Sequence, residues 1–153
     1  MKDMEIQELH HKAMELADKA DFQKMQGNAD EANALFRQSL DAERKAALTA
    51  QQQRVGEPTE SVLFRSAATL AYTIGDYREA ERLTCLGLAG NPPVEIAEEL
   101  RSLYDAVSLE RSMSQIESNS NSKEQQSVTI TIPIRERNLL NVLVRKFGWA
   151  CVF

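Results

Sequence analysis

The sequence predicts a mainly α-helical protein with two antiparallel helical hairpins, a capping helix and a small β-α(-β) appendage at the C-terminus. Three observations support this fold class. Over residues 4–107 the apolar side chains recur at steps of three and four, the period of a helix with one buried face. Two glycines, Gly27 and Gly75, interrupt that pattern where tight turns are needed. After residue 127 the apolar residues alternate with other residues, which is typical of a strand.

The first hairpin is expected to consist of helices over residues 4–25 and 29–52. Gly27-Asn28 ends the first of these helices, because glycine takes the left-handed conformation at little cost. Gly56-Glu57-Pro58 ends the second, because proline cannot continue a helix. The apolar stripes are Ile6, Leu9, Ala13, Leu16, Ala17 and Ala20 in the first helix, and Ala32, Leu35, Phe36, Leu40, Ala47 and Ala50 in the second.

The second hairpin is expected to join a helix over residues 58–74 to a fourth helix that ends near Gly90. Asp76, with Glu79 three positions later, resembles a capping box for the fourth helix. A fifth helix follows Asn91-Pro92-Pro93, because proline suits the first position of a helix. The stripes of the third and fifth helices are Leu63, Ala67, Leu70, Ala71 and Ile74, and Val94, Ala97, Leu100, Leu103, Tyr104 and Val107.

Small residues occupy equivalent places around the two turns. Each turn glycine has an alanine seven positions before it and another five positions after it. Antiparallel helices in a tight hairpin need small side chains where their backbones approach each other. We therefore expect the two hairpins to be copies of one unit. The alanines are Ala20, Ala32, Ala68 and Ala80.

This pattern resembles the tetratricopeptide repeat over residues 4–108, with the fifth helix as the capping helix. The second copy matches at Ala68, Ala71, Gly75, Asp76-Tyr77, Ala80 and Pro92, and the first at Ala20, Gly27, Ala32 and Phe36. The turn glycines are 48 positions apart, whereas the family's usual period is about 34. The surplus is close to four helical turns, which indicates a second helix lengthened by whole turns. The alternative is a long hairpin of the kind found in microtubule-interacting-and-transport domains.

The resemblance implies a non-catalytic adaptor that binds a protein partner on a concave face, lined by the first helix of each hairpin. The partner-binding residues on that face would be Asp21, Lys24, Arg65, Thr69 and Tyr72, with Met14, Met25, Val62 and Thr73 beside them. For Met14, Met25 and Val62 the alternative is a place in the core. Tyrosine and arginine are enriched in the hot spots of protein interfaces.

Composition divides the chain into a helical domain of residues 1–110, a flexible Ser/Asn/Gln linker of residues 111–126 and an appendage of residues 127–153. The linker has too few apolar residues to offset the entropy of ordering it. The appendage is expected to form a strand, a short helix and a last short strand. One strand and one helix cannot cover its apolar groups, which are therefore expected to dimerise or dock. They are Val128, Ile130, Ile132, Leu139, Leu143, Phe147 and Trp149.

Two further resemblances concern an alternative function. Residues 61–107 resemble a helical module of bacterial, Bacteroidetes-type proteins, and residues 128–149 resemble small bacterial antitoxin-like proteins. The second resemblance implies a regulator that binds a toxin partner and also DNA, through Thr129, Thr131, Arg135, Arg137 and Arg145. A ribbon-helix-helix regulator needs a second helix after the strand, and the sequence offers none there.

Charge and hydropathy limit the partners and the location. Residues 1–110 carry a net charge of −8 and residues 111–153 one of +3. An acidic body repels phosphate, which argues against nucleic-acid binding by that part. No apolar run is long enough to span a bilayer, and the N-terminus lacks the apolar core of a signal peptide. We therefore expect a cytoplasmic protein without membrane contact.

The sequence holds no known catalytic or metal-binding motif, so we expect no enzyme activity, no cofactor and no metal site. His10 and His11 point about 100° apart on a helix and are interpreted as surface histidines, with Glu15 within reach of His11. Cys85 falls on the apolar stripe of its helix and is expected to be a small buried residue rather than a nucleophile. Cys151, in an apolar segment, is interpreted in the same way.

Overall fold

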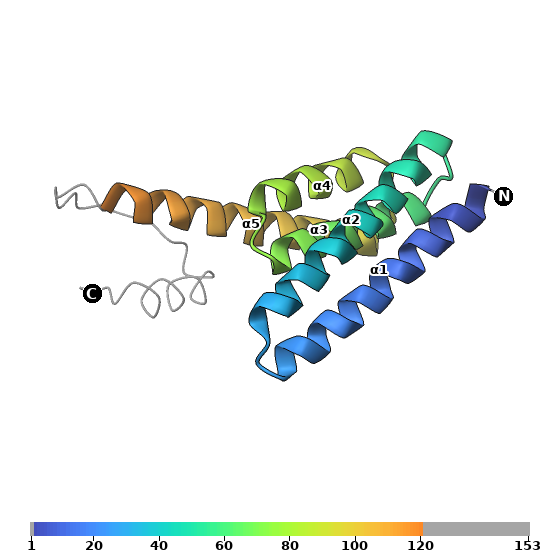
Figure 1. Ribbon diagram of the computed structural model, residues 1–153. Helices are drawn as coiled ribbons and strands as arrows, with labels where there is room; N and C mark the ends of the chain where they lie inside the picture. The colour runs from blue at the N-terminus through green and yellow to red at the C-terminus, as the bar shows by residue number, and fades with distance from the viewer. Residues whose placement is uncertain (1, 121–153) are drawn as a thin grey trace. The chain divides into compact units, whose positions relative to one another are not determined.

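The computed structural model describes residues 2–120, which form five α-helices and no strand (Figure 1). α1 (Lys2–Met25) and α2 (Ala29–Gln53) form the first hairpin, and α3 (Thr59–Thr73) and α4 (Tyr77–Ala89) the second. α5 (Val94–Ser120) follows. The all-helical prediction is confirmed for this part of the chain, with each helix close to its expected start. The predicted β-α(-β) appendage lies outside the described residues.

The two hairpins close with the same turn. Gly27 and Gly75 have φ values of 84° and 76°, in the left-handed region that favours glycine. The next residue in each turn donates its backbone N–H to a carbonyl at the end of the preceding helix. Asn28 donates to Gln23 at 3.0 Å, and Asp76 donates to Ala71 at 2.9 Å. The prediction that both turns are built alike is thus confirmed.

The alanines around these turns are all buried, as their spacing predicts. They are Ala20, Ala32, Ala68 and Ala80. Their small side chains allow α1 to approach α2 and α3 to approach α4 closely. Between α1 and α2 the approach is close enough for the Ser39 hydroxyl to donate a 2.7 Å hydrogen bond to the backbone carbonyl of Ala13 on the facing helix.

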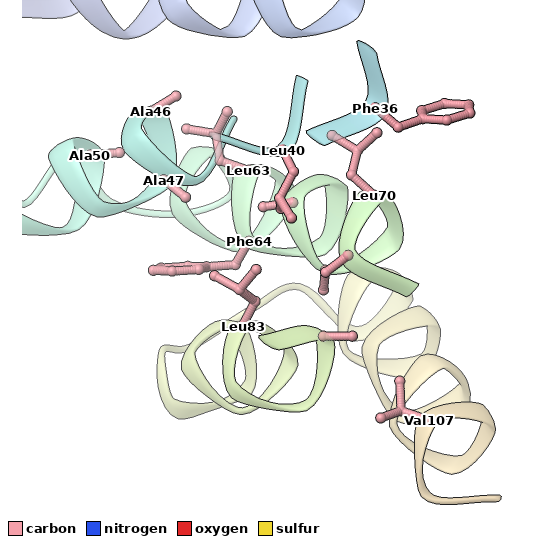
Figure 2. Close-up of a cluster of buried hydrophobic side chains, with 14 of the residues drawn as sticks. Phe36, Leu40, Ala46, Ala47, Ala50, Leu63, Phe64, Leu70, Leu83 and Val107 are labelled. Carbon is pink, nitrogen blue, oxygen red and sulfur yellow. The ribbon is translucent and has the colours of Figure 1, made fainter. Parts of the chain in front are cut away.

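The core lies in layers across the helices. α2 lies between α1 and α3, and α4 and α5 lie beyond α3 (Figure 2). Phe64 of α3 and Leu83 of α4 are fully buried and lie side by side between their helices. Gly87 makes this packing possible, because a Cβ atom there would lie only 3.1 Å from the Phe64 Cβ and 3.0 Å from a methyl group of Leu100 on α5.

The first hairpin is longer than the second. α1 and α2 have 24 and 25 residues, whereas α3 and α4 have 15 and 13. The length of α2 accounts for the wide spacing of the turn glycines. Residues 21–31, at the end of the first hairpin, are exposed apart from the half-buried Gln23. Figure 1 shows this end standing clear of α3 and α4.

Asp76 caps α4, as the sequence predicts. Its side-chain oxygen accepts a 3.1 Å hydrogen bond from the backbone N–H of Glu79. In a full capping box the Glu79 carboxylate would accept a hydrogen bond from the backbone N–H of Asp76. Here that carboxylate instead binds Arg82 at 2.7 Å and lies 3.6 Å from Arg44 of α2. Hydrogen bonds from Arg82 lower the pKa of Glu79, with a further contribution from Arg44. The ionised carboxylate therefore links α4 to α2.

α5 is longer than its composition predicts. It continues to Ser120, so residues 111–120, which we expected to belong to the linker, are helical. Serine hydroxyls in this stretch bond to carbonyls of the preceding turn, as Ser112 does to Ser108 at 2.8 Å. Hydrogen-bonded in this way, a serine is tolerated within a helix. At the other end Val94 is 68% exposed, although its periodicity assigns it to the buried stripe with Leu100 and Val107.

The buried aromatic ring of α3 is expected to be essential for stability. Phe64→Ala should lower the free energy of unfolding by about 3–5 kcal/mol, because it leaves a cavity beside Leu83. Phe22→Ala, the same change at a side chain that is 59% exposed, should change it by less than about 0.5 kcal/mol. Urea denaturation followed by circular dichroism measures both values, and equal losses would contradict the burial of Phe64.

Candidate functional site

The five predicted partner-binding residues lie in two groups. Asp21 and Lys24 are exposed on the last turns of α1, whereas Arg65, Thr69 and Tyr72 lie on α3. α2 lies between these two helices (Figure 2). The structure therefore places one group at the end of the first hairpin and the other along α3.

The α3 group is fixed by contacts with neighbouring helices. Arg65 forms an ion pair with Glu99 of α5. The half-buried ring of Tyr72 lies 5.6 Å from the ring of Tyr77 at the start of α4. The hydroxyl of the exposed Thr69 donates a 2.9 Å hydrogen bond to the backbone carbonyl of Arg65 in its own helix. Two members of this group thus join α3 to other helices, and Thr69 is the exposed one.

The α1 group lies beside an exposed apolar pair. Phe22 is 59% exposed and Met25 is 85% exposed. The two residues are three positions apart on a helix, so their side chains are neighbours on one face. Asp21 and Lys24 adjoin them in the sequence. The core alternative for Met25 is therefore wrong, and the hairpin end has an apolar face among charged groups. We call Phe22 and Met25 the hairpin-end pair.

The tail residues predicted to dimerise or dock lie outside the described residues. They are Val128, Ile130, Ile132, Leu139, Leu143, Phe147 and Trp149. Cys151 also lies outside the described range.

A second candidate site lies inside the bundle, where one carboxylate contacts both neighbouring helices. Glu43 of α2 is fully buried, which is rare for a glutamate. Nδ1 of His10 on α1 lies 2.9 Å from each of its two carboxylate oxygens. The Ser66 side chain of α3 also hydrogen-bonds the carboxylate. We call these three residues the carboxylate cluster, which links α1, α2 and α3.

Burial and hydrogen bonding act in opposite directions on the charge of the carboxylate cluster. Burial raises the pKa of the Glu43 carboxyl above its ordinary value of 4.5, although the hydrogen bond and charge of His10 and the hydrogen bond of Ser66 oppose the shift. The His10 side chain is 41% exposed, so its imidazole can exchange protons with water. The cluster thus pairs a carboxylate that is costly to ionise with an imidazole that is in contact with solvent.

His10, Glu43 and Ser66 are arranged in an order that fits a structural link between helices better than a catalytic site for acyl transfer. In a Ser-His-acid triad the imidazole stands between the hydroxyl and the carboxylate and takes the hydroxyl proton. Here the carboxylate stands between the imidazole and the Ser66 hydroxyl. The His10 nitrogen that faces the interior is therefore directed at the acid rather than at a nucleophile.

The burial of Glu43 was not predicted, although the sequence pattern contains a signal for it. Glu43 lies three positions after Leu40 and four before Ala47, on the same apolar stripe. The interpretation of His10 as a surface histidine is wrong in part, because its imidazole turns toward this buried acid. His11 is exposed and lies 3.5 Å from Glu15, as predicted.

Cys85 is exposed on α4, so the expectation of a buried thiol is wrong. The buried face of α4 includes Leu83 and Gly87. Cys85 lies two positions from each, about 200° around the helix, and therefore points away from the core.

Within residues 2–120 no group of histidine, cysteine, aspartate and glutamate side chains could hold a metal ion. None of the five helices is both long enough and apolar enough to cross a membrane. Comparisons of the chain with protein-family models, with curated proteins and with solved structures found no match.

The two adjacent histidines offer a matched test of the carboxylate cluster. His10→Ala is expected to lower the free energy of unfolding near neutral pH by about 1–3 kcal/mol, because it removes a hydrogen-bond partner of the buried carboxylate. His11→Ala, which removes only an exposed contact with Glu15, should change it by less than about 0.5 kcal/mol. Chemical denaturation distinguishes the two, and similar losses would rule out a stabilising role for the His10 contact.

Proposed function

We propose that this chain is a non-catalytic adaptor that binds another protein through the end of its first helical hairpin. The observation that carries the proposal is the exposure of the hairpin-end pair, Phe22 and Met25, on a hairpin longer than its neighbour. Exposed apolar side chains that adjoin on a rigid helix are the usual anchors of a protein interface. Asp21 and Lys24, beside them, supply the charged rim that gives such an interface its specificity.

In this proposal the tail, residues 127–153, pairs two copies of the chain. The support for this pairing is the amino-acid sequence of the tail. The apolar residues of this segment alternate over a predicted strand, so that one face is apolar and the other polar. Strand pairing across a two-fold axis covers such an apolar face with an identical one. A dimer presents two hairpin ends, which raises the avidity of the adaptor for a partner with two matching sites.

The hairpin-end pair is expected to provide most of the partner's binding energy. The double variant Phe22→Gln, Met25→Gln should weaken capture of the partner from an extract of the source organism by about tenfold or more. The matched control is Met4→Gln, Val94→Gln, which removes two apolar side chains of similar exposure, 61% and 68%, elsewhere on the surface. Quantitative mass spectrometry of captured proteins measures the effect.

Two outcomes would count against this surface. If the Phe22→Gln, Met25→Gln variant captures the same proteins in the same amounts as the natural chain, the hairpin-end pair is not the binding site. If both double variants lose capture equally, nonspecific hydrophobic binding explains the captured proteins better than a specific site does. Circular dichroism of each variant shows whether the fold is retained.

The tail is expected to make the full chain a dimer. Ile130→Asp, Ile132→Asp should reduce the molar mass from about twice the chain mass of 17.2 kDa to a single chain, because each change places a charge on the apolar face of the predicted strand. Thr129→Asp, Thr131→Asp places the same charges on the opposite face and should leave the dimer intact. Light scattering measures the mass, and a monomeric natural chain would remove the dimer from the proposal.

A further inference from the structure

α1 packs against the bundle through alanines, the buried Ile6 and the half-buried Leu9, and also makes polar contacts with α2. Its fully buried side chains, Ala13 and Ala20, bury little apolar area, and Ile6 is the largest buried side chain among the residues described in this helix. By contrast α3, α4 and α5 bury Phe64, Leu83, Leu100 and other large groups in the core. The polar contacts of His10 and Ser39 between α1 and α2 add to the apolar packing of α1. Helices with few large buried contacts open at lower free energy than the core does.

Two of these polar contacts reach the interior of the first hairpin, and one of them includes ionisable groups. The Ser39 hydroxyl donates to the backbone carbonyl of Ala13 and does not change its charge with pH in the ordinary range. The other contact joins His10 to both carboxylate oxygens of Glu43. The carboxylate is fully buried while the imidazole is partly exposed. The charge of this interface therefore depends on the protons that the His10–Glu43 pair holds.

We propose that one proton shared by His10 and Glu43 controls how firmly α1 is held, so that α1 detaches more readily at mildly alkaline than at mildly acidic pH. With the proton present, the pair is neutral overall, as an imidazolium facing a carboxylate or as an imidazole facing a carboxylic acid. Without it, a neutral imidazole faces an ionised carboxylate inside the bundle. A buried charge without a counter-charge is costly, and detachment of α1 lets water reach it.

The pKa of the Glu43 carboxyl alone also predicts that α1 is held less firmly as the pH rises. Burial raises the pKa of the Glu43 carboxyl above 4.5, so the folded chain binds this proton more tightly than the unfolded chain does. Stability from this group is therefore highest at low pH and falls as the pH rises from 4.5 through the raised value. Because Nδ1 of His10 lies 2.9 Å from both carboxylate oxygens, loss of the shared proton leaves this contact with a net negative charge.

The charged groups near the pair have partners of their own. Arg44, next to Glu43 in the sequence, pairs with Asp41 at 2.8 Å and lies 3.6 Å from Glu79 of α4. Lys45 lies 4.0 Å from Glu5 of α1 at the surface. On α3, Arg65 pairs with Glu99, and Ser66 reaches the Glu43 carboxylate as a neutral hydroxyl. Among the described residues, His10 is thus the ionisable group in contact with the Glu43 carboxylate.

Hydrogen–deuterium exchange of the full chain tests this directly. Exchange of α1 and α3 amides is measured between about pH 5 and about pH 8, the range in which histidine pairs change charge, and is corrected for the intrinsic exchange rate. We expect the opening equilibrium of α1 to rise by about tenfold across this range, the change that one pKa unit of coupling produces. The amides of α3, next to Phe64 and Leu83, should show no comparable rise.

Three variants separate the pair from general effects of pH. Glu43→Gln keeps the shape and an acceptor for His10 but cannot ionise, so the α1 opening should lose its pH dependence. His10→Asn keeps a donor toward Glu43 but cannot carry the shared proton, and it should leave α1 more open than in the natural chain at about pH 6. His11→Asn is the matched control on the same helix, since its contact with Glu15 is exposed, and should behave as the natural chain does.

The opening of α1 in the natural chain and in these variants decides whether the His10–Glu43 pair controls its attachment. The proposal is overturned if α1 in the natural chain opens equally at both pH values, or if Glu43→Gln keeps the natural pH dependence. If Glu43→Gln does not fold, the comparison of His10→Asn with His11→Asn decides instead. Equal opening in these two variants at about pH 6 would then overturn it, and greater opening in His10→Asn would support it.

Discussion

Close approach of antiparallel helices through small side chains is the constraint on which the rest of this structure depends. Alanines bring α1 against α2 and α3 against α4, and glycines in the left-handed region close both hairpins. Small side chains bury little apolar area, so a hairpin built from them gains less from the hydrophobic effect than one built from leucines. The second hairpin makes up the difference where Phe64, Leu83 and Leu100 meet around Gly87. The first hairpin adds the contacts of Ser39 and Glu43 with α1 to its apolar packing.

The carboxylate cluster has a structural consequence beyond its charge. Alanine stripes discriminate poorly between alignments, because a helix shifted by one turn still places small side chains against its neighbour. Such a shift of α1 would separate His10 from Glu43 and the Ser39 hydroxyl from the carbonyl of Ala13. Buried polar groups that must meet a partner commonly fix the register of helices in this way, at some cost in stability. The two contacts therefore distinguish the observed alignment of α1 on α2 from its neighbours.

Much of the fold could be predicted because local chemistry determines it. The turn glycines, the buried alanines and the Asp76 cap each follow from residues close together in the sequence. The two misses have different causes. Cys85 faces solvent because it lies about 200° around α4 from Leu83 and Gly87. Glu43 is buried although it is charged, because His10 and Ser66 meet it from other helices. The candidate site was less predictable than the fold, because periodicity identifies a face without showing which helix covers it.

The hairpin-end pair and His10 of the carboxylate cluster lie on one helix, α1, and this has a consequence for recognition. α1 carries Phe22 and Met25 near one end and His10 nearer the other. A partner that contacts only the hairpin end would bind α1 equally well whether or not the helix is firmly attached. A partner that contacts both the hairpin end and Thr69 on α3 needs the two helices at a fixed spacing, which depends on the carboxylate cluster. Its affinity would therefore change with the protonation of the His10–Glu43 pair, since binding then stabilises the attached state over the detached one.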